Sequence, residues 1–114
     1  MLELETPALL LHLDVVERNL RYMAERARQL GVALRPHAKT HKSPAIAAWQ
    51  MEAGATGICC AKLAEAEVFA EAGITNIRLP YPVNPVSAGR VLALLDRGVA
   101  LSIIVDDLAV AESW

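Results

Sequence analysis

Hydrophobic and polar positions fall along the chain in blocks that predict a strand followed by a helix. Residues Thr6 to Leu13 are almost wholly apolar and too few for a typical helix, so they predict a strand. The next block has apolar residues at helical spacing from Val16 to Leu30, which predicts a helix that begins at Asp14 and ends at Gly31. The chain is therefore expected to open with a strand and an amphipathic helix.

The same alternation repeats after this first helix. Further strands are predicted over Val32 to Thr40, Thr56 to Ala61, Asn76 to Tyr81 and Val99 to Val105. Helices are predicted over Ser43 to Gly54, Ala64 to Ala72 and Asn84 to Arg97, with another from Leu108 onward. Strands that alternate with helices at roughly 20 to 25 residues per unit favour parallel βαβ units.

Two architectures fit this pattern: a doubly wound open sheet and a (β/α)8 barrel. Apolar strands suit either, because helices cover the sheet in both. A barrel needs about 250 residues, and the 114 residues hold about four βα units after the first strand. The last residues, Glu112 to Trp114, lie inside a predicted helix without a stop signal. We therefore expect one domain, residues 1–114, truncated from a longer barrel, with a complete small α/β domain as the alternative.

Composition narrows the class of protein. The chain is 54% hydrophobic and 21% charged, which is typical of a globular protein, and its net charge of -2 gives no general attraction to nucleic acid or to an anionic membrane. No apolar run reaches the roughly 18 residues of a membrane span, and the start of the chain lacks the features of a signal peptide. We interpret the adjacent Cys59 and Cys60 as reduced core thiols of a cytoplasmic protein, with a redox pair as the alternative.

One segment carries unusual chemistry, the run from Arg35 to Lys42. On a strand, alternation places Arg35, His37, Lys39 and His41 on one face. In barrels and open α/β sheets, ligands bind at the carboxyl ends of the strands, where this run lies. The sequence therefore predicts a site here, although a basic strand end is also typical of a solvated rim.

The run suits a lysine that reacts with an aldehyde. An ordinary lysine, with a pKa of about 10.4, must lose its proton to attack, and burial or nearby positive charge favours that loss. Arg35, Lys42 and any protonated histidine of the run would supply such charge and attract an anionic cofactor. A zinc pair is disfavoured, because on a strand His37 and His41 would lie ~13 Å apart at ~3.3 Å per residue.

The run Arg35-Pro36-His37-Ala38-Lys39-Thr40-His41-Lys42-Ser43-Pro44 resembles the signature of the D-threonine aldolase and D-serine dehydratase-like family. These are fold-type III enzymes that use pyridoxal 5'-phosphate (PLP) and are related to the alanine racemase barrel. Residues 6–20, 57–67 and 105–107 resemble further segments of the family in the same order. One departure is Ala61, where many relatives have Gln.

The resemblance implies an alanine racemase N-terminal domain-like fold, a partial (β/α)8 TIM barrel. It also implies that Lys39 forms a Schiff base with PLP, with Lys42 as the competing candidate, and that His37 and His41 flank the cofactor. No metal ligand is expected in this chain, because the divalent metal of the family is held by a later domain.

The activity implied is that of a lyase acting on β-hydroxy-D-amino acids. The aldolase reaction, cleavage of the Cα–Cβ bond to glycine and an aldehyde, is our first expectation. D-serine dehydratase activity, a non-catalytic PLP-binding protein and an inactive fragment are the alternatives, and racemase activity is not separated from them. The expected partner is a small D-amino acid, without nucleic acid or membrane, and a homodimer is compatible with the family.

Overall fold

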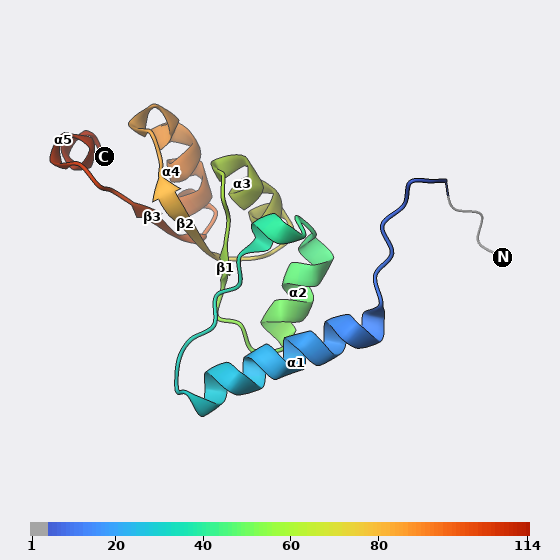
Figure 1. The fold of residues 1–114 in the computed structure, drawn as a ribbon. Coiled ribbons are helices and arrows are strands. Elements are labelled where there is room, and N and C mark those ends of the chain that lie inside the picture. Colours follow the sequence, from blue (N-terminus) through green and yellow to red (C-terminus); the bar gives the residue numbers. More distant parts are fainter. Residues whose placement is uncertain (1–4) are drawn as a thin grey trace.

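The computed structural model describes residues 5–114, which form an open α/β structure (Figure 1). The α-helices are α1 (Leu13–Gln29), α2 (Pro44–Glu52), α3 (Leu63–Glu71), α4 (Ala88–Asp96) and α5 (Leu108–Ser113). The strands are β1 (Ile58–Cys59), β2 (Asn76–Pro82) and β3 (Ala100–Ile104), and two single 3-10 turns are η1 (Ala38–Thr40) and η2 (Pro85–Ser87). The predicted alternation of strands and helices is confirmed from residue 44 onward.

The strands form one parallel sheet in the order β1-β2-β3. A fourth segment runs beside β1: His37 forms an isolated parallel bridge with Cys59, and the Cys59 N–H donates to the Pro36 carbonyl at 2.7 Å. With α2, this segment makes the first of four βα units, so the expected number is confirmed. The strand predicted over Val32 to Thr40, however, is wrong as a regular strand, because only this short stretch pairs and the chain then turns into η1.

Apolar side chains lie between the sheet and its helices, where they form a single core. Ile58 and Ile77 of the strands are fully buried, and Phe69 of α3 and Leu94 of α4 are 2% and 1% exposed. These are the apolar positions from which the strands and helices are predicted. Burial of these side chains between strands and helices therefore explains the parallel sheet covered by helices.

The predicted opening strand is wrong. Residues 5–12 have no strand structure and extend away from the rest of the chain (Figure 1), and Leu9 is fully exposed. A strand needs a hydrogen-bonded neighbour, and none of the described strands lies beside this segment. Helix α1 begins at Leu13 with His12 as its N-cap, so Asp14 lies in the first turn rather than before it.

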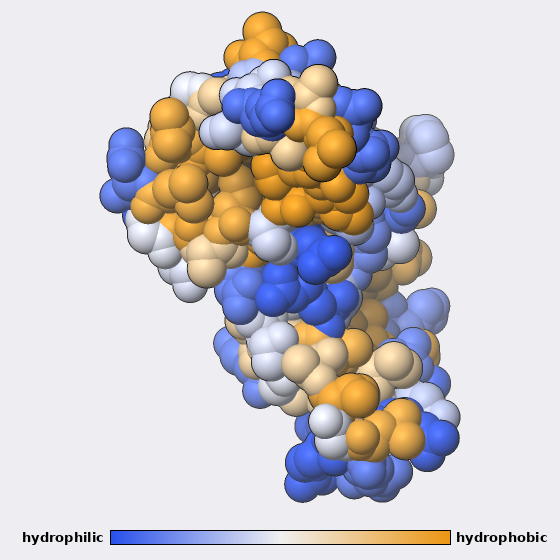
Figure 2. All heavy atoms as spheres, turned by 90° about the vertical axis from the view of Figure 1, so that its left-hand side faces the viewer, coloured by the Kyte–Doolittle hydropathy of each residue, from blue (hydrophilic) through white to orange (hydrophobic). Residues whose placement is uncertain are grey.

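The β3 side of the sheet carries an exposed apolar surface. Figure 2 shows hydrophobic side chains gathered there. Leu92 and Leu95 of α4 line one hollow together with Leu101 and Ile103 of β3. Strand β3 is the last in the sheet order, so among residues 5–114 this edge has no neighbouring strand. The structure is thus a barrel segment that is open on this side.

Within residues 5–114, no helix is both long enough and apolar enough to cross a membrane.

Close contact between β1 and β2 predicts a steric requirement at Gly57. A Cβ atom added there would lie 2.5 Å from the Asn76 carbonyl oxygen, which is backbone and cannot move aside freely. We expect Gly57→Ala to lower the free energy of unfolding by about 1–3 kcal/mol, measured by urea denaturation.

The matched control is Gly89→Ala on α4, where no atom beyond the adjacent residues and the helix's own backbone lies within 4 Å of the added Cβ. Because alanine favours helix, this variant should be unchanged or up to about 1 kcal/mol more stable. Equal loss of stability in both variants would contradict the steric argument.

Candidate active site

The segment that carries the candidate lysine leaves the carboxyl end of the sheet in a single turn. Ala38 is fully buried and starts η1, which lets Lys39 project from the surface. Lys42 then adopts a left-handed backbone with φ of 50°, and the Ser43 hydroxyl caps α2 by accepting from the Ile46 N–H at 3.4 Å. The turn is therefore fixed on one side by a bridge to β1 and on the other by a helix cap.

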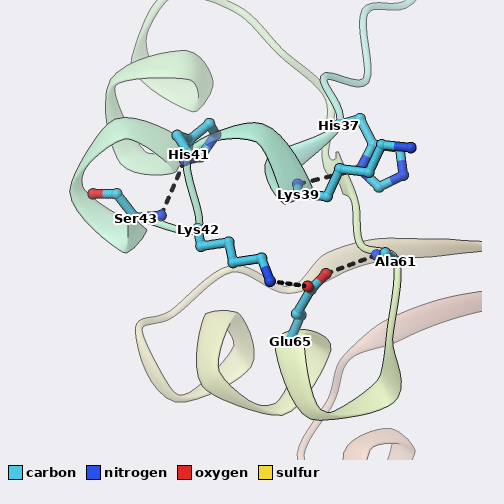
Figure 3. Close-up of polar contacts among 7 residues, drawn as sticks. All are labelled: His37, Lys39, His41, Lys42, Ser43, Ala61 and Glu65. Atoms are coloured by element: carbon cyan, nitrogen blue, oxygen red, sulfur yellow. Dashed lines mark hydrogen bonds and ion pairs between the residues drawn. The ribbon is translucent and has the colours of Figure 1, made fainter.

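This turn overturns the expected arrangement of the run. The strand alternation that placed His37, Lys39 and His41 on one face ends at Ala38, because a 3-10 turn rotates each residue differently from a strand. Figure 3 shows His37 and Lys39 together and His41 apart from them. The structure thus brings together two of the three predicted site residues.

Lys39 is exposed, and its amine contacts a tyrosine from a distant part of the chain. Its Nζ donates to Tyr81 Oη of β2 at 3.2 Å and lies 5.7 Å from the centre of the Tyr81 ring. The His37 ring lies 6.4 Å from the same ring. Lys39, His37 and Tyr81 therefore form one cluster at the carboxyl end of the sheet.

His37 presents a hydrogen-bond donor that nothing in the structure accepts. The Lys39 backbone N–H donates to His37 Nδ1 at 3.3 Å, so in the neutral imidazole the proton is assigned to Nε2. This Nε2 atom is buried and has no partner among residues 5–114. Burial lowers the pKa of His37, the charge of Lys39 lowers it further, and Glu65 opposes both. We therefore expect His37 to be a neutral imidazole whose Nε2–H is available as a hydrogen-bond donor close to Lys39.

His41 faces the packing between α2 and α3 instead. Its Nδ1 accepts from the Ser43 N–H at 3.0 Å, and its ring meets Phe69 edge-on at 6.4 Å. Burial lowers its pKa, and the nearby Gln50 amide partly opposes this, although no hydrogen bond of ordinary length joins that amide to Nε2. His41 therefore packs against the helices and stabilises the turn, and its ring is not part of the cluster around the Lys39 amine.

Lys42 is paired with a carboxylate, and its amine therefore lies away from the cluster of Lys39, His37 and Tyr81. Its Nζ lies 3.3 Å from Glu65 Oε1, and the other oxygen of Glu65 accepts from the Ala61 N–H at 2.8 Å (Figure 3). Burial alone would raise the pKa of Glu65, but these hydrogen bonds and the Lys42 charge bring it below its usual value. The carboxylate ties the turn to the loop before α3.

These pairings correct the predicted electropositive pocket. Burial favours the neutral form of both histidines, and the charge of Lys42 is compensated by Glu65. Of Arg35 and Lys42, the two basic side chains expected to supply positive charge, only Lys42 has an ion pair within the described part of the chain. Lys39 is also exposed, so residues 5–114 by themselves form an open edge and do not enclose it.

The cysteines lie next to this edge but in the core. Cys60 is fully buried, and burial raises its pKa to about 12, while Cys59 is partly buried and its Sγ lies 3.8 Å from the Arg35 carbonyl oxygen. Both thiols are free. Across residues 5–114, no three His, Cys, Asp or Glu side chains are grouped to hold a metal ion.

Sequence reasoning missed Tyr81 and Glu65. Tyr81 ends a strand that the sequence predicted, and the rule that ligands bind at the carboxyl ends of strands would have pointed to it. Glu65 gave no such signal, because its role depends on the left-handed turn at Lys42 that only the structure shows.

A family model for the alanine racemase N-terminal domain matches residues 11–114. The D-threo-3-hydroxyaspartate dehydratase of Delftia sp. strain HT23 is 43% identical over 113 residues, which are 99% of this chain and 30% of the relative. The D-threonine aldolase of Arthrobacter sp. is 45% identical over 103 residues, which are 90% of this chain and 27% of the relative.

Comparison with solved structures finds the same class of enzymes. The crystal structure of D-threonine aldolase from Filomicrobium marinum matches with a TM-score of 0.90 and 45% identity, over 96% of this chain and 30% of that one. This chain therefore spans about three-tenths of the length of the relatives it matches.

The Glu65 contacts predict a pH-dependent contribution to stability. Because the folded-state pKa of Glu65 is below its ordinary value, its contribution is present above the unfolded pKa of about 4.3 and is lost as the pH falls through the folded value. We expect Glu65→Gln to lower the free energy of unfolding by about 1 kcal/mol at pH 7, with the difference from wild type shrinking below pH 4 in urea titrations.

The matched control is Glu71→Gln at the exposed end of α3, which should change stability little at either pH. A constant difference between wild type and Glu65→Gln down to pH 2 would contradict this account.

Proposed function

The chain belongs to the alanine racemase N-terminal domain family, and on that premise we propose that it forms the lysine-bearing part of a PLP-dependent lyase acting on β-hydroxy-D-amino acids. The observation that carries the proposal is the cluster at the carboxyl end of the sheet, where an accessible Lys39 amine lies beside His37 and Tyr81. Relatives at 43% and 45% identity are named as a dehydratase and an aldolase, which supports the lyase class.

The residues present fit PLP. The buried His37 Nε2 is a donor in need of an acceptor, and PLP carries a phenolic oxygen, a pyridine nitrogen and a phosphate that can accept. An unmet buried donor is costly, so a ligand that supplies an acceptor gains affinity. We propose that Lys39 holds the cofactor covalently and that His37 contacts it.

PLP, when bound, supplies an aldehyde for condensation with amines and a ring that accepts electrons from the α-carbon of the substrate. Lys39 must present an unprotonated amine to that aldehyde. The His37 imidazole next to it offers its Nε2 proton for hydrogen bonding. The buried Ala38 fixes the backbone from which the lysine projects.

Lys39 is favoured over Lys42 by geometry. The Lys42 amine is 3.3 Å from a Glu65 oxygen, and this ion pair directs it toward the loop before α3. The Lys39 amine meets an uncharged phenol instead. Lys42 is thus paired with a carboxylate, whereas Lys39, three residues earlier, contacts a phenol. The environment of Lys39 is the one that suits the reactive role.

Among residues 5–114 no ligands are grouped to hold a metal. The divalent metal implied by the family would need ligands outside this chain. His41 as a residue bordering the cofactor stays a prediction, as do the homodimer and the cytoplasmic location.

Trapping with PLP tests the assignment of Lys39. PLP condenses with the lysine amine with loss of water, and borohydride then reduces the new carbon–nitrogen double bond to a stable secondary amine. We expect a visible absorption band before reduction and, by mass spectrometry of peptides after it, a label mainly on Lys39.

Lys39→Ala should abolish the band, whereas the control Lys42→Ala should retain it. The other two lysines of the sequence are Lys42 and Lys62. A label found mainly on either of them in a well-folded sample would contradict the assignment of Lys39 as the reactive lysine.

Product analysis distinguishes the two lyase reactions. With the protein in full and a β-hydroxy-D-amino acid, the aldolase reaction releases glycine and an aldehyde, whereas the dehydratase reaction releases ammonia and a 2-oxo acid. We expect glycine and aldehyde in equal amounts, absent with the L-enantiomer and with Lys39→Ala. Ammonia without glycine would identify the dehydratase instead.

A further inference from the structure

The amine of Lys39 has a single polar contact among residues 5–114, and Tyr81 makes it. The two residues are 42 positions apart in the sequence, so the fold, and not local chain geometry, brings them together. A lysine side chain has much rotamer freedom, and the backbone of η1 fixes only its first atoms. The tyrosine hydroxyl is therefore the polar group of the described residues that the amine contacts.

The strand that carries Tyr81 is irregular at the point that matters. With strict alternation, Tyr81 would share the buried face of Ile77 and Leu79, but it is 47% exposed and contacts Lys39. The pairing of β2 with β3 shifts register between Leu79 and Pro82. Such an irregularity re-aims a side chain, which accounts for the tyrosine facing the site.

The chemistry of a phenol suits a reactive amine. A phenol both donates and accepts hydrogen bonds, so it can hold the charged amine as an acceptor and the neutral amine as a donor. A carboxylate in its place would form an ion pair with the amine, as Glu65 does with Lys42, and nearby negative charge favours the charged, unreactive form of an amine. A phenylalanine would keep the ring beside His37 but could hold neither form.

We infer that Tyr81 is a positioning residue for Lys39, its hydroxyl holding the amine at the carboxyl end of the sheet where a carbonyl compound reaches it. The inference rests on the proposed function, since it assumes that Lys39 is the lysine that reacts.

The test compares the rates at which PLP and borohydride label each lysine of the full chain. Lys42 and Lys62 serve as internal references within the same molecule. We expect Tyr81→Phe to slow labelling of Lys39 about threefold to tenfold, the range expected for loss of one hydrogen bond, with both references unchanged. Tyr22→Phe, at the other tyrosine, which is exposed on α1, is the matched control and should change nothing.

A second variant gives a readout that a purely structural role would not move. Tyr81→Glu places a carboxylate beside the amine, so the pH of half-maximal Lys39 labelling should rise by about one unit while that of Lys62 stays constant. Circular dichroism establishes that both Tyr81 variants keep the helix content of the wild type.

The outcomes separate the two claims. Preferential labelling of Lys39 in the wild type, at an unchanged rate in Tyr81→Phe, would overturn the positioning role and leave the proposed function standing. Slower labelling of all three lysines would also overturn it, because it would indicate general loss of structure. Absence of any preference for Lys39 in the wild type would remove the proposed function, and the role of Tyr81 with it.

Discussion

Parallel pairing of residues 34–37 with β1 is the constraint on which the site depends. The bridge between His37 and Cys59 fixes where the chain leaves the sheet, and the burial of Ala38 immediately afterwards fixes the direction of the turn. Lys39 is the next residue, so its place at the carboxyl end of the sheet follows from backbone hydrogen bonds made before it. A shift in this pairing by one residue would bury the lysine or turn it away.

Electrostatic pairing then separates two lysines that the sequence leaves alike. Glu65 is largely buried and accepts from the Ala61 N–H, so its carboxylate is held in place before Lys42 approaches it. The left-handed backbone at Lys42 costs conformational energy for a residue other than glycine, and the ion pair on one side with the Ser43 cap on the other stabilises it. Lys42 is thus held in its ion pair, whereas the Lys39 amine stays exposed.

Most of the fold could be predicted from the sequence, and the misses have physical causes. Burial of apolar strands, the Ser43-Pro44 helix start and the number of βα units depend on local pattern, and all were confirmed. Residues 6–13 are as apolar as a strand, but pairing needs a neighbour that pattern does not reveal. The run after His37 was predicted as strand because alternation has no signal for a single 3-10 turn.

The site was predictable in its location and only partly in its geometry. Lys39 and His37 share one cluster, as expected, but there is less positive charge around them than predicted, because burial favours the neutral form of both histidines and Lys42 is paired with Glu65. The partners of Lys39 in the cluster are an imidazole with an unmet donor and a phenol. Strong positive charge would bind an anionic cofactor but would also attract other anions. Neutral hydrogen-bond donors instead favour a ligand whose acceptor atoms lie where the donors point. Within residues 5–114 the Lys39 amine contacts a phenol and is exposed at the carboxyl end of the sheet, and the proposed reactivity would start from that position.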